Sequence, residues 1–252
     1  MSLCLLSPYS WVEDICTGDE DYKPEEGKIM RSKRSSSATQ FWARRFTWKE
    51  MHEYTCGFSD PLGGGGFGNV FRGAMDDGTP ISVKQLINGG LQGNKEFIAE
   101  VSILGRTHHL QLVRLVGYCL EGGTDKLLVY EYMENGSLDA WIFSKTPNVA
   151  PESEEIKADK KRRPILPWEW RFDITLGTAK GLAYLHEECE DRIIHMDLKP
   201  QNILLGADFF PKISDFGMSR RVVRDEQSAV VTMMRGTPGY LVPEWLTDGA
   251  RS

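Results

Sequence analysis

Short apolar runs dominate the stretch from residue 46 to residue 132 and define its predicted elements. Four runs have the length and apolar content of β-strands: residues 69–72, 81–84, 112–116 and 127–132. Asp77-Gly78, between the first two runs, is a strong signal for a tight hairpin turn. Over residues 95–104 the apolar positions instead recur at spacings of four and three, as on one face of a helix. This pattern predicts a small sheet with one helix.

From residue 168 onward the apolar positions follow the period of a helix. Six positions predict one long helix over residues 168–187: Phe172, Leu176, Ala179, Leu182, Ala183 and His186. The preceding stretch, residues 144–166, is polar, is interrupted by prolines, and carries an acidic and a basic cluster, so we expect a mobile surface insert. The second half of the chain is therefore predicted to be mainly helical.

Residues 1–45 have low hydrophobicity and high charge, so we expect a disordered N-terminal segment ahead of a domain over residues 46–252. The basic, serine-rich part of this segment, residues 28–37, fits either a solvated linker or a patch that touches anionic lipid. The chain has no run of about 18 apolar residues, so we expect no membrane-spanning segment in it.

Composition narrows the class of protein. The chain has 252 residues, of which 40% are hydrophobic, enough for one large domain or two small lobes. A formal net charge of -6 argues against nucleic acid as the main partner, because phosphate-backbone binders are usually basic. The five cysteines form no C-x-x-C pair, so we expect neither a disulfide framework nor a zinc site, and we interpret them as reduced thiols in a cytosolic compartment.

The first candidate for chemistry is a glycine-rich stretch. Residues 62–70, Leu-Gly-Gly-Gly-Gly-Phe-Gly-Asn-Val, contain the pattern G-x-G-x-x-G-x-V. Glycines let backbone N–H groups approach phosphates closely, although adjacent glycines also occur in plain flexible turns. The stretch leads into a predicted strand and not into a helix, which disfavours a dinucleotide site of the Rossmann type.

Lys84 and Glu100 form a second candidate. Lys84 ends a predicted strand, and Glu100 lies beside the apolar face of the predicted helix. Both could be ordinary surface charges. Alternatively, a lysine near a triphosphate needs a fixed direction, and a carboxylate on a facing helix can supply it.

The most specific signal lies between residues 195 and 217. Asp197 and Asn202 are separated by a proline, which predicts that they share a loop where their side chains can converge. Such residues are often turn formers. Asp215 opens Asp-Phe-Gly after a further short apolar run, and Asp215 and Asn202 together offer the hard oxygen ligands that Mg²⁺ prefers.

In order, spacing and context these segments resemble a protein kinase. Val242-Pro243-Glu244 stands where that family has Ala-Pro-Glu, and Lys199 and the run 236–240, Gly-Thr-Pro-Gly-Tyr, are similar to serine/threonine kinases. Four further segments look like plant receptor-like kinases of the lectin-type S-domain branch, which is related to the Pelle and interleukin-receptor-associated kinases: residues 46–50, 128–133, 135–138 and 181–186. The resemblance covers residues 46–252.

The resemblance implies an α+β, bilobal protein-kinase-like fold. Its small antiparallel-sheet lobe with one helix would occupy about residues 46–132, and an incomplete, mainly helical large lobe about residues 133–252. The chain stops eight residues after Glu244, whereas a family kinase continues through several more helices. The missing part would uncover an apolar face of the large lobe.

The resemblance also implies ATP and Mg²⁺ as cofactors, with ATP bound between the lobes. It assigns ATP contacts to Leu62, Gly63, Gly65, Gly68, Val70, Ser82, Lys84, Tyr130, Glu131, Met133 and Leu204. Lys84 would be held by Glu100, and Asn202 and Asp215 would hold the metal.

The catalytic roles implied by the resemblance belong to the loop. Asp197 would accept the proton of a substrate hydroxyl, Lys199 would stabilise the transferring phosphoryl group, and Thr237 would hydrogen-bond near Asp197. Met196 replaces the arginine that usually gathers a phosphorylated activation loop. We therefore expect that phosphorylation at Ser228 or Thr232 is not the main switch to activity.

The function implied is an ATP-dependent protein serine/threonine kinase of the receptor-like type, acting in signalling. Its partners would be a protein substrate with Ser or Thr and a membrane-proximal receptor complex, in the cytoplasm at the inner face of the plasma membrane. Because of where the chain stops, two alternatives stay open: a catalytically inactive ATP-binding or scaffolding fragment, and an unstable product without a function of its own.

Overall fold

The structure is a computed structural model that describes residues 43–65, 68–86, 91–121, 126–143, 164–222 and 236–241. Contacts divide the chain into two compact units. The first holds the described residues up to Thr107 together with Leu115–Tyr130, and the second holds His108–Arg114 together with the described residues from Glu131 onward. Several expectations lie outside the described residues: those for residues 1–42 and 144–163, for Ser228 and Thr232, and for Val242-Pro243-Glu244.

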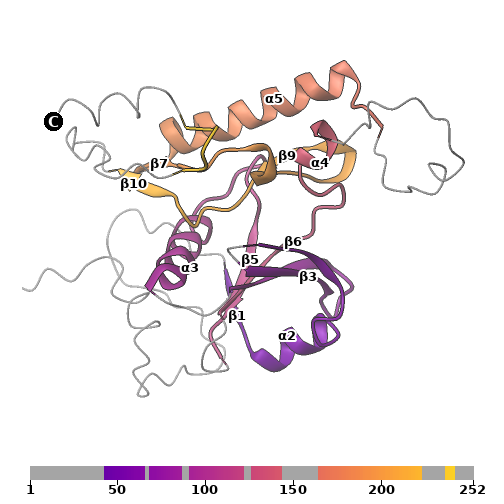
Figure 1. The fold of residues 1–252 in the computed structure, drawn as a ribbon. Coiled ribbons are helices and arrows are strands. Elements are labelled where there is room, and N and C mark those ends of the chain that lie inside the picture. The colour runs from indigo at the N-terminus through magenta and orange to yellow at the C-terminus, as the bar shows by residue number, and fades with distance from the viewer. Residues whose placement is uncertain are drawn as a thin grey trace, which may run out of the picture. The chain divides into compact units, whose positions relative to one another are not determined.

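The first unit is built on a six-stranded sheet (Figure 1). In spatial order its strands are β1 (Arg44–Phe46), β5 (Leu115–Cys119), β6 (Lys126–Glu131), β4 (Pro80–Leu86), β3 (Gly68–Ala74) and β2 (Pro61–Gly65). The hairpin predicted at Asp77-Gly78 is confirmed, because β3 and β4 pair antiparallel and Gly78 adopts a φ of 80°. The expectation of an antiparallel sheet is wrong at one edge, where β1 pairs parallel with β5. Three residues of strand are too few to show a period in the sequence.

Helix α2 (Trp48–Tyr54) was not predicted. It begins with a capping box, in which the Thr47 hydroxyl accepts from the Glu50 N–H at 3.2 Å and the Glu50 carboxylate accepts from the Thr47 N–H at 2.7 Å. The pattern Thr-x-x-Glu is a known signal for a helix start and was present in the sequence. The helix buries Met51 completely.

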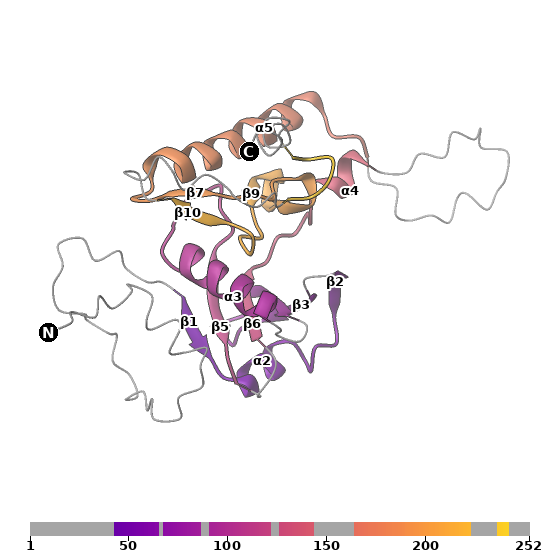
Figure 2. The same ribbon diagram turned by 60° about the vertical axis from the view of Figure 1, so that its left-hand side comes forward.

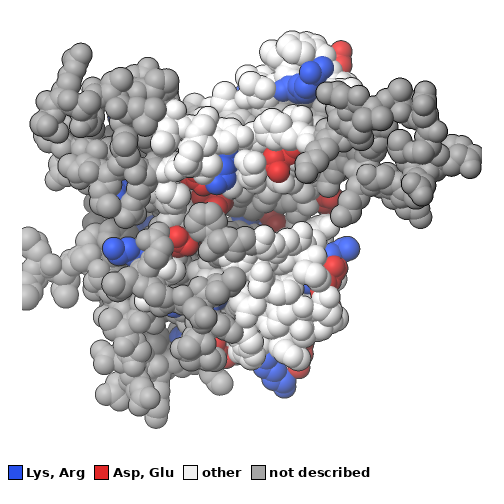
Figure 3. Space-filling model, in the orientation of Figure 1, with Lys and Arg blue, Asp and Glu red and all other residues white. Residues whose placement is uncertain are grey.

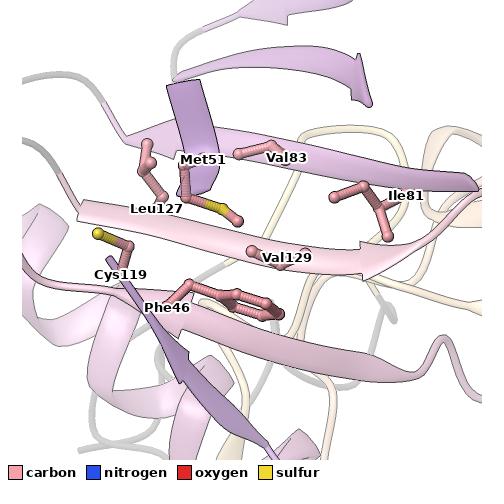
Figure 4. Packing of buried hydrophobic residues seen from close by; sticks show 7 residues of the cluster. All are labelled: Phe46, Met51, Ile81, Val83, Cys119, Leu127 and Val129. Carbon is pink, nitrogen blue, oxygen red and sulfur yellow. The ribbon is translucent and has the colours of Figure 1, made fainter. Parts of the chain in front are cut away.

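One face of the sheet carries the apolar cluster of this unit. Its members come from α2 and four strands, as Figure 4 shows: Phe46, Met51, Ile81, Val83, Cys119, Leu127 and Val129. Because side chains alternate along a strand, Lys84 points to the opposite face from Val83. On that opposite face lies α3 (Leu91–Leu104), whose apolar residues Phe97, Val101 and Leu104 are buried as predicted. The helix starts four residues before the predicted residue 95.

The third predicted strand, over residues 112–116, is displaced in the structure to β5 (Leu115–Cys119). The reason is a competing partner in the second unit. Leu112 forms an isolated bridge with Ile213, and the Val113 N–H donates to the Ile213 carbonyl at 2.9 Å. The apolar run therefore divides between two units, and only its second part joins the sheet.

The second unit combines helices with two small strand pairs. Helix α5 (Trp168–Ala183) continues as the π-helical turn η2 (Tyr184–Glu188), so the prediction of a helix over residues 168–187 is confirmed. Figures 1 and 2 show α5 running beside β7 and β9. The remaining elements are α4 (Asp139–Ile142), β7 (Arg192–Ile194), η3 (Pro200–Asn202), β8 (Ile203–Leu205), η4 (Ala207–Phe209), β9 (Pro211–Ile213) and β10 (Arg220–Val222). Strand β7 pairs antiparallel with β10, and β8 pairs antiparallel with β9.

The described surface is mixed in character. On the face that Figure 3 shows, Lys and Arg form small separate groups among uncharged residues. Helix α5 exposes Trp168, Phe172 and Leu176, so apolar side chains on this helix face solvent in the described part of the chain. None of the described helices has both the length and the apolar character needed to cross a membrane.

Candidate active site

The described part of the glycine-rich stretch lies in two paired strands, here called the glycine hairpin, of which the sequence predicted only the second. Strands β2 and β3 pair antiparallel, with Gly63 opposite Val70 and Gly65 opposite Gly68. Gly68 has a φ of 132°, and a Cβ at this position would lie 2.1 Å from the Gln85 carbonyl oxygen. Only glycine fits there. A Cβ built at Gly63 would meet nothing within 4 Å, so the space beside the backbone is open at this residue.

Lys84 and Glu100 come together in the first unit. The Lys84 Nζ lies 2.8 Å from Glu100 Oε1, and the side chain of Glu100 is completely buried. The second carboxylate oxygen, Oε2, accepts a hydrogen bond from the hydroxyl of Tyr130. Sequence reasoning found the pair but placed Glu100 only beside the buried face, and it did not foresee the bond from Tyr130. A carboxylate this deeply buried needs such partners to remain charged.

Asp197 lies in the loop between β7 and β8 and accepts hydrogen bonds from three side chains. Lys199 Nζ donates at 2.7 Å, Thr237 Oγ1 at 2.6 Å and Asn202 Nδ2 at 3.1 Å. Burial alone would raise the pKa of Asp197, but these hydrogen bonds and the charge of Lys199 outweigh it and lower that pKa. The loop therefore holds an ionised carboxylate at neutral pH.

Thr237 closes a triangle with Asp197 and Lys199. The Lys199 Nζ lies 2.8 Å from Thr237 Oγ1 as well as 2.7 Å from the Asp197 carboxylate. Thr237 follows Gly236, whose φ of 145° is one that other residues rarely adopt. The hydrogen bond expected between Thr237 and the loop is therefore present, although Thr237 is 40 residues from Asp197 in sequence.

Asn202 and Asp215 are the expected metal ligands, and hydrogen bonds connect their segments. The Ser214 N–H and hydroxyl both donate to the Asn202 carbonyl, at 2.9 and 3.1 Å, which fixes Asp215 next in the chain. The amide nitrogen of Asn202 faces Asp197, and its amide oxygen takes no part in those bonds. Asp215 has a φ of 64°, a conformation that is uncommon outside glycine and occurs at functional sites.

The donor set at Asn202 and Asp215 fits a small, hard cation. One carboxylate and one amide oxygen suit Mg²⁺, which takes few protein ligands and completes its shell with water and phosphate oxygens. In the part of the chain that the structure describes, no three His, Cys, Asp or Glu side chains gather as a metal site.

His195 supports the loop from the inside. Its Nδ1 accepts from the Asp197 N–H at 3.3 Å, so its Nε2 carries the proton and donates to the Ser214 carbonyl at 2.9 Å. The ring also meets Phe216 edge to face, with centroids 4.8 Å apart. Burial lowers the pKa of His195, which favours the neutral imidazole.

The residues expected to contact adenine are divided between the units. Val70 and Ser82 lie on β3 and β4 of the first unit, whereas Glu131, Met133 and Leu204 belong to the second. The Glu131 side chain also accepts from Lys212 Nζ and from the Arg114 N–H, both at 2.7 Å. Sequence reasoning missed these two partners, because neither lies in a recognisable motif.

Comparisons with known proteins agree with this geometry. The protein kinase domain family matches residues 57–252. The chain is 51% identical to the G-type lectin S-receptor-like serine/threonine-protein kinase SD2-5 of Arabidopsis thaliana. The 208 aligned residues cover 82% of the chain and 23% of that protein. It is 52% identical to At2g19130, a kinase from the same plant that is described in the same words. The 205 aligned residues cover 81% of the chain and 23% of that protein.

A rice protein gives a similar result. LECRK4 of Oryza sativa subsp. indica, another G-type lectin S-receptor-like serine/threonine-protein kinase, is 44% identical over 207 residues, which are 81% of the chain and 23% of that protein. The chain thus spans about a quarter of the length of these curated relatives.

Proposed function

This chain belongs to the protein kinase domain family, and on that basis we propose that it transfers the γ-phosphate of ATP to Ser or Thr hydroxyls of a protein substrate. The observation that carries this proposal is the triangle of Asp197, Lys199 and Thr237. It presents an ionised carboxylate beside a lysine, with a threonine hydroxyl to hold both. A binding or scaffolding protein has no need of this arrangement.

The proposed reaction uses the loop residues for positioning and for one proton. A bond forms between the substrate hydroxyl oxygen and the γ-phosphorus, while the bond from that phosphorus to the β–γ bridging oxygen breaks and ADP leaves. Asp197 orients the hydroxyl and accepts its proton. Lys199 offsets negative charge on the transferring group, and much of the rate gain comes from positioning and charge neutralisation.

The remaining residues bind the nucleotide. Lys84, fixed by Glu100, contacts the α- and β-phosphates, and the glycine hairpin offers its backbone to them. Asn202 and Asp215 would hold Mg²⁺, which neutralises phosphate charge when it is bound. Backbone groups of residues 131–133 would hydrogen-bond the edge of the adenine ring.

The names of the relatives suggest where this activity is used. SD2-5, At2g19130 and LECRK4 are all described as S-receptor-like kinases. We therefore place the chain, as part of this proposal, at the inner face of the plasma membrane in a receptor complex.

Replacing Asp197 by Asn tests the proposed function. The change keeps the shape of the side chain but removes the base, so we expect phosphate transfer to a generic Ser/Thr protein substrate to fall by roughly 10³-fold. Binding of Mg-ATP, followed by titration calorimetry, should stay within about twofold, because general acid–base catalysis concerns the reacting proton rather than the nucleotide.

Asp208→Asn is the matched control. Asp208 is exposed on η4 with a φ of 52°, a conformation that Asn adopts readily, so this change should leave transfer unaltered. Full activity in the Asp197→Asn variant, or a wild-type chain that binds Mg-ATP without any transfer, would contradict the proposal.

A further inference from the structure

One oxygen of the Glu131 side chain joins three segments of the second unit. Glu131 Oε1 accepts from the Arg114 N–H and from Lys212 Nζ, each at 2.7 Å. The Glu131 N–H in turn donates to the Arg114 carbonyl at 3.2 Å. Arg114 and Glu131 therefore exchange two hydrogen bonds, and Lys212 adds an ion pair to the same carboxylate.

Two of the three segments lead to different parts of the proposed site, and the third runs beside one of them. Glu131 begins the stretch of residues 131–133 that would meet the adenine edge. Lys212 is the middle residue of β9, and Asp215, the proposed metal ligand, follows three residues later. The segment that ends at Arg114 runs along β9, because the Ile213 N–H donates to the Gln111 carbonyl at 2.8 Å.

The geometry of the pair points to a role in positioning the Glu131 carboxylate. The side chains of Lys212 and Glu131 remain 19% and 23% exposed. Ion pairs that solvent reaches contribute little to folding stability. Two donors that converge on one oxygen nevertheless fix the direction of the carboxylate, and with it the backbone of the residue that carries it.

We propose that the Glu131–Lys212 pair is a positioning device for the nucleotide. It holds the backbone of residues 131–133 in the orientation that the adenine edge requires, so it determines the affinity for adenine nucleotides and leaves the chemical step unchanged. This inference rests on the proposed function, because it assumes that these residues bind ATP. Lys212 and Arg114 are the residues that it adds to the site.

Replacement of Lys212 by Met tests the proposal, with Lys212→Arg as the conservative variant. We measure the Kd for Mg-ATP and for adenosine by calorimetry, and KM and kcat by phosphate transfer. We expect Lys212→Met to raise both Kd values and the KM for ATP by about five- to tenfold, with kcat within about twofold. Lys212→Arg should restore the wild-type values, and Glu131→Gln, which keeps an acceptor for the Arg114 N–H, should show a smaller increase.

Lys49→Met is the matched control, because Lys49 is an exposed lysine on α2 of the first unit. An unchanged Kd in the Lys212→Met variant, with only a lower Tm, would overturn the inference and leave the pair a structural one. Weaker binding of Mg-ATP with unchanged binding of adenosine would also overturn it, because the pair would then act through Asp215 and the metal.

The same measurements separate this inference from the function on which it rests. A wild-type chain that binds neither Mg-ATP nor adenosine would overturn the proposed function and this inference together. A wild-type chain that binds both, with a Lys212→Met variant that binds them equally well, would overturn the inference alone.

Discussion

Two lysine–carboxylate pairs of the molecule look alike in their contacts but are assembled in different ways. Lys84 and Glu100 lie 2.8 Å apart in the first unit, and Lys199 and Asp197 lie 2.7 Å apart in the second. Both carboxylates are almost fully buried. The first pair joins a strand to a helix across 16 residues of sequence, whereas the second joins residues two apart in one loop.

The two pairs differ in which parts of the structure fix the distance between the lysine and the carboxylate. Lys84 and Glu100 meet only if β4 and α3 pack correctly, so their distance depends on the core of the whole unit. Lys199 and Asp197 would be neighbours in almost any loop, and their geometry is instead fixed by a distant residue, Thr237. A local motif can therefore encode the presence of the second pair without encoding its geometry.

The largest effect is expected from breaking the first pair. Glu100→Gln removes the negative charge that orients Lys84 and leaves Tyr130 with a weaker acceptor, so kcat/KM for phosphate transfer should fall by roughly 10²-fold. Lys84→Met should give a loss of the same order, and the double variant should be little worse than either, because the two residues act as one unit.

Lys95→Met serves as the control for the first pair, since Lys95 is an exposed lysine at the start of α3. Steady-state kinetics with ATP as the varied substrate measures the outcome. If the losses in kcat/KM of Lys84→Met and Glu100→Gln simply add in the double variant, the two residues act separately. That result would contradict the view that the first pair works as one unit.

The sequence predicted the residues of both pairs better than it predicted their surroundings. Lys84, Glu100, Asp197 and Lys199 stand within segments that resemble those of protein kinases, and this resemblance was enough to single them out. The hydrogen bond from Tyr130 to Glu100 was missed, because it depends on how β6 and α3 pack in three dimensions.

The misplaced elements have similar physical causes. The displaced strand β5 shows that an apolar run does not reveal which partner each of its residues will choose, since Leu112 and Val113 bond to Ile213 instead. The parallel edge strand β1 was missed because pairing between segments so far apart leaves no local period. Helix α2 is a different case, because the capping box at Thr47 was visible in the sequence.

A smaller effect is expected from the residue that fixes the second pair. Thr237→Ala removes the hydrogen bonds between the Thr237 hydroxyl and both Asp197 and Lys199. Hydrogen bonds to charged groups contribute about 1.5–3 kcal/mol, and Asp197 keeps two other donors, so we expect kcat to fall about tenfold. The Kd for Mg-ATP should stay within about twofold.

Thr237→Ser keeps the hydroxyl and should recover most of the rate. Thr175→Ala is the control, since Thr175 is an exposed threonine on α5 whose hydroxyl bonds to the Arg171 carbonyl. A Thr237→Ala variant with normal kcat would mean that the loop fixes Asp197 without its distant partner, and the contrast between the pairs would disappear.

The smallest expected effect is on the pH dependence of the free energy of unfolding. It arises from His195, which supports the loop that carries Asp197 and Lys199. His195 binds the Asp197 backbone as a neutral ring, and burial holds its pKa below the ordinary value of 6.5. Below pH 6.5 the unfolded chain binds a proton more readily than the folded chain does, so His195 should lower the free energy of unfolding as pH falls from 6.5 to 5.5. The lowered pKa of Asp197 acts in the same direction only below about 4, its ordinary value being 3.8.

Urea denaturation at pH 7.5, 6.5 and 5.5 measures this contribution. His195→Gln keeps a donor for the Ser214 carbonyl but cannot be protonated, so its free energy of unfolding should fall less than that of the wild type as pH decreases from 6.5 to 5.5. His52→Gln, at an exposed histidine on α2, is the control for the exchange of histidine for glutamine. Equal pH dependence in the wild type and in His195→Gln would show that the folded loop accepts a charged imidazole behind Asp197. The second pair would then be held less rigidly than its hydrogen bonds suggest.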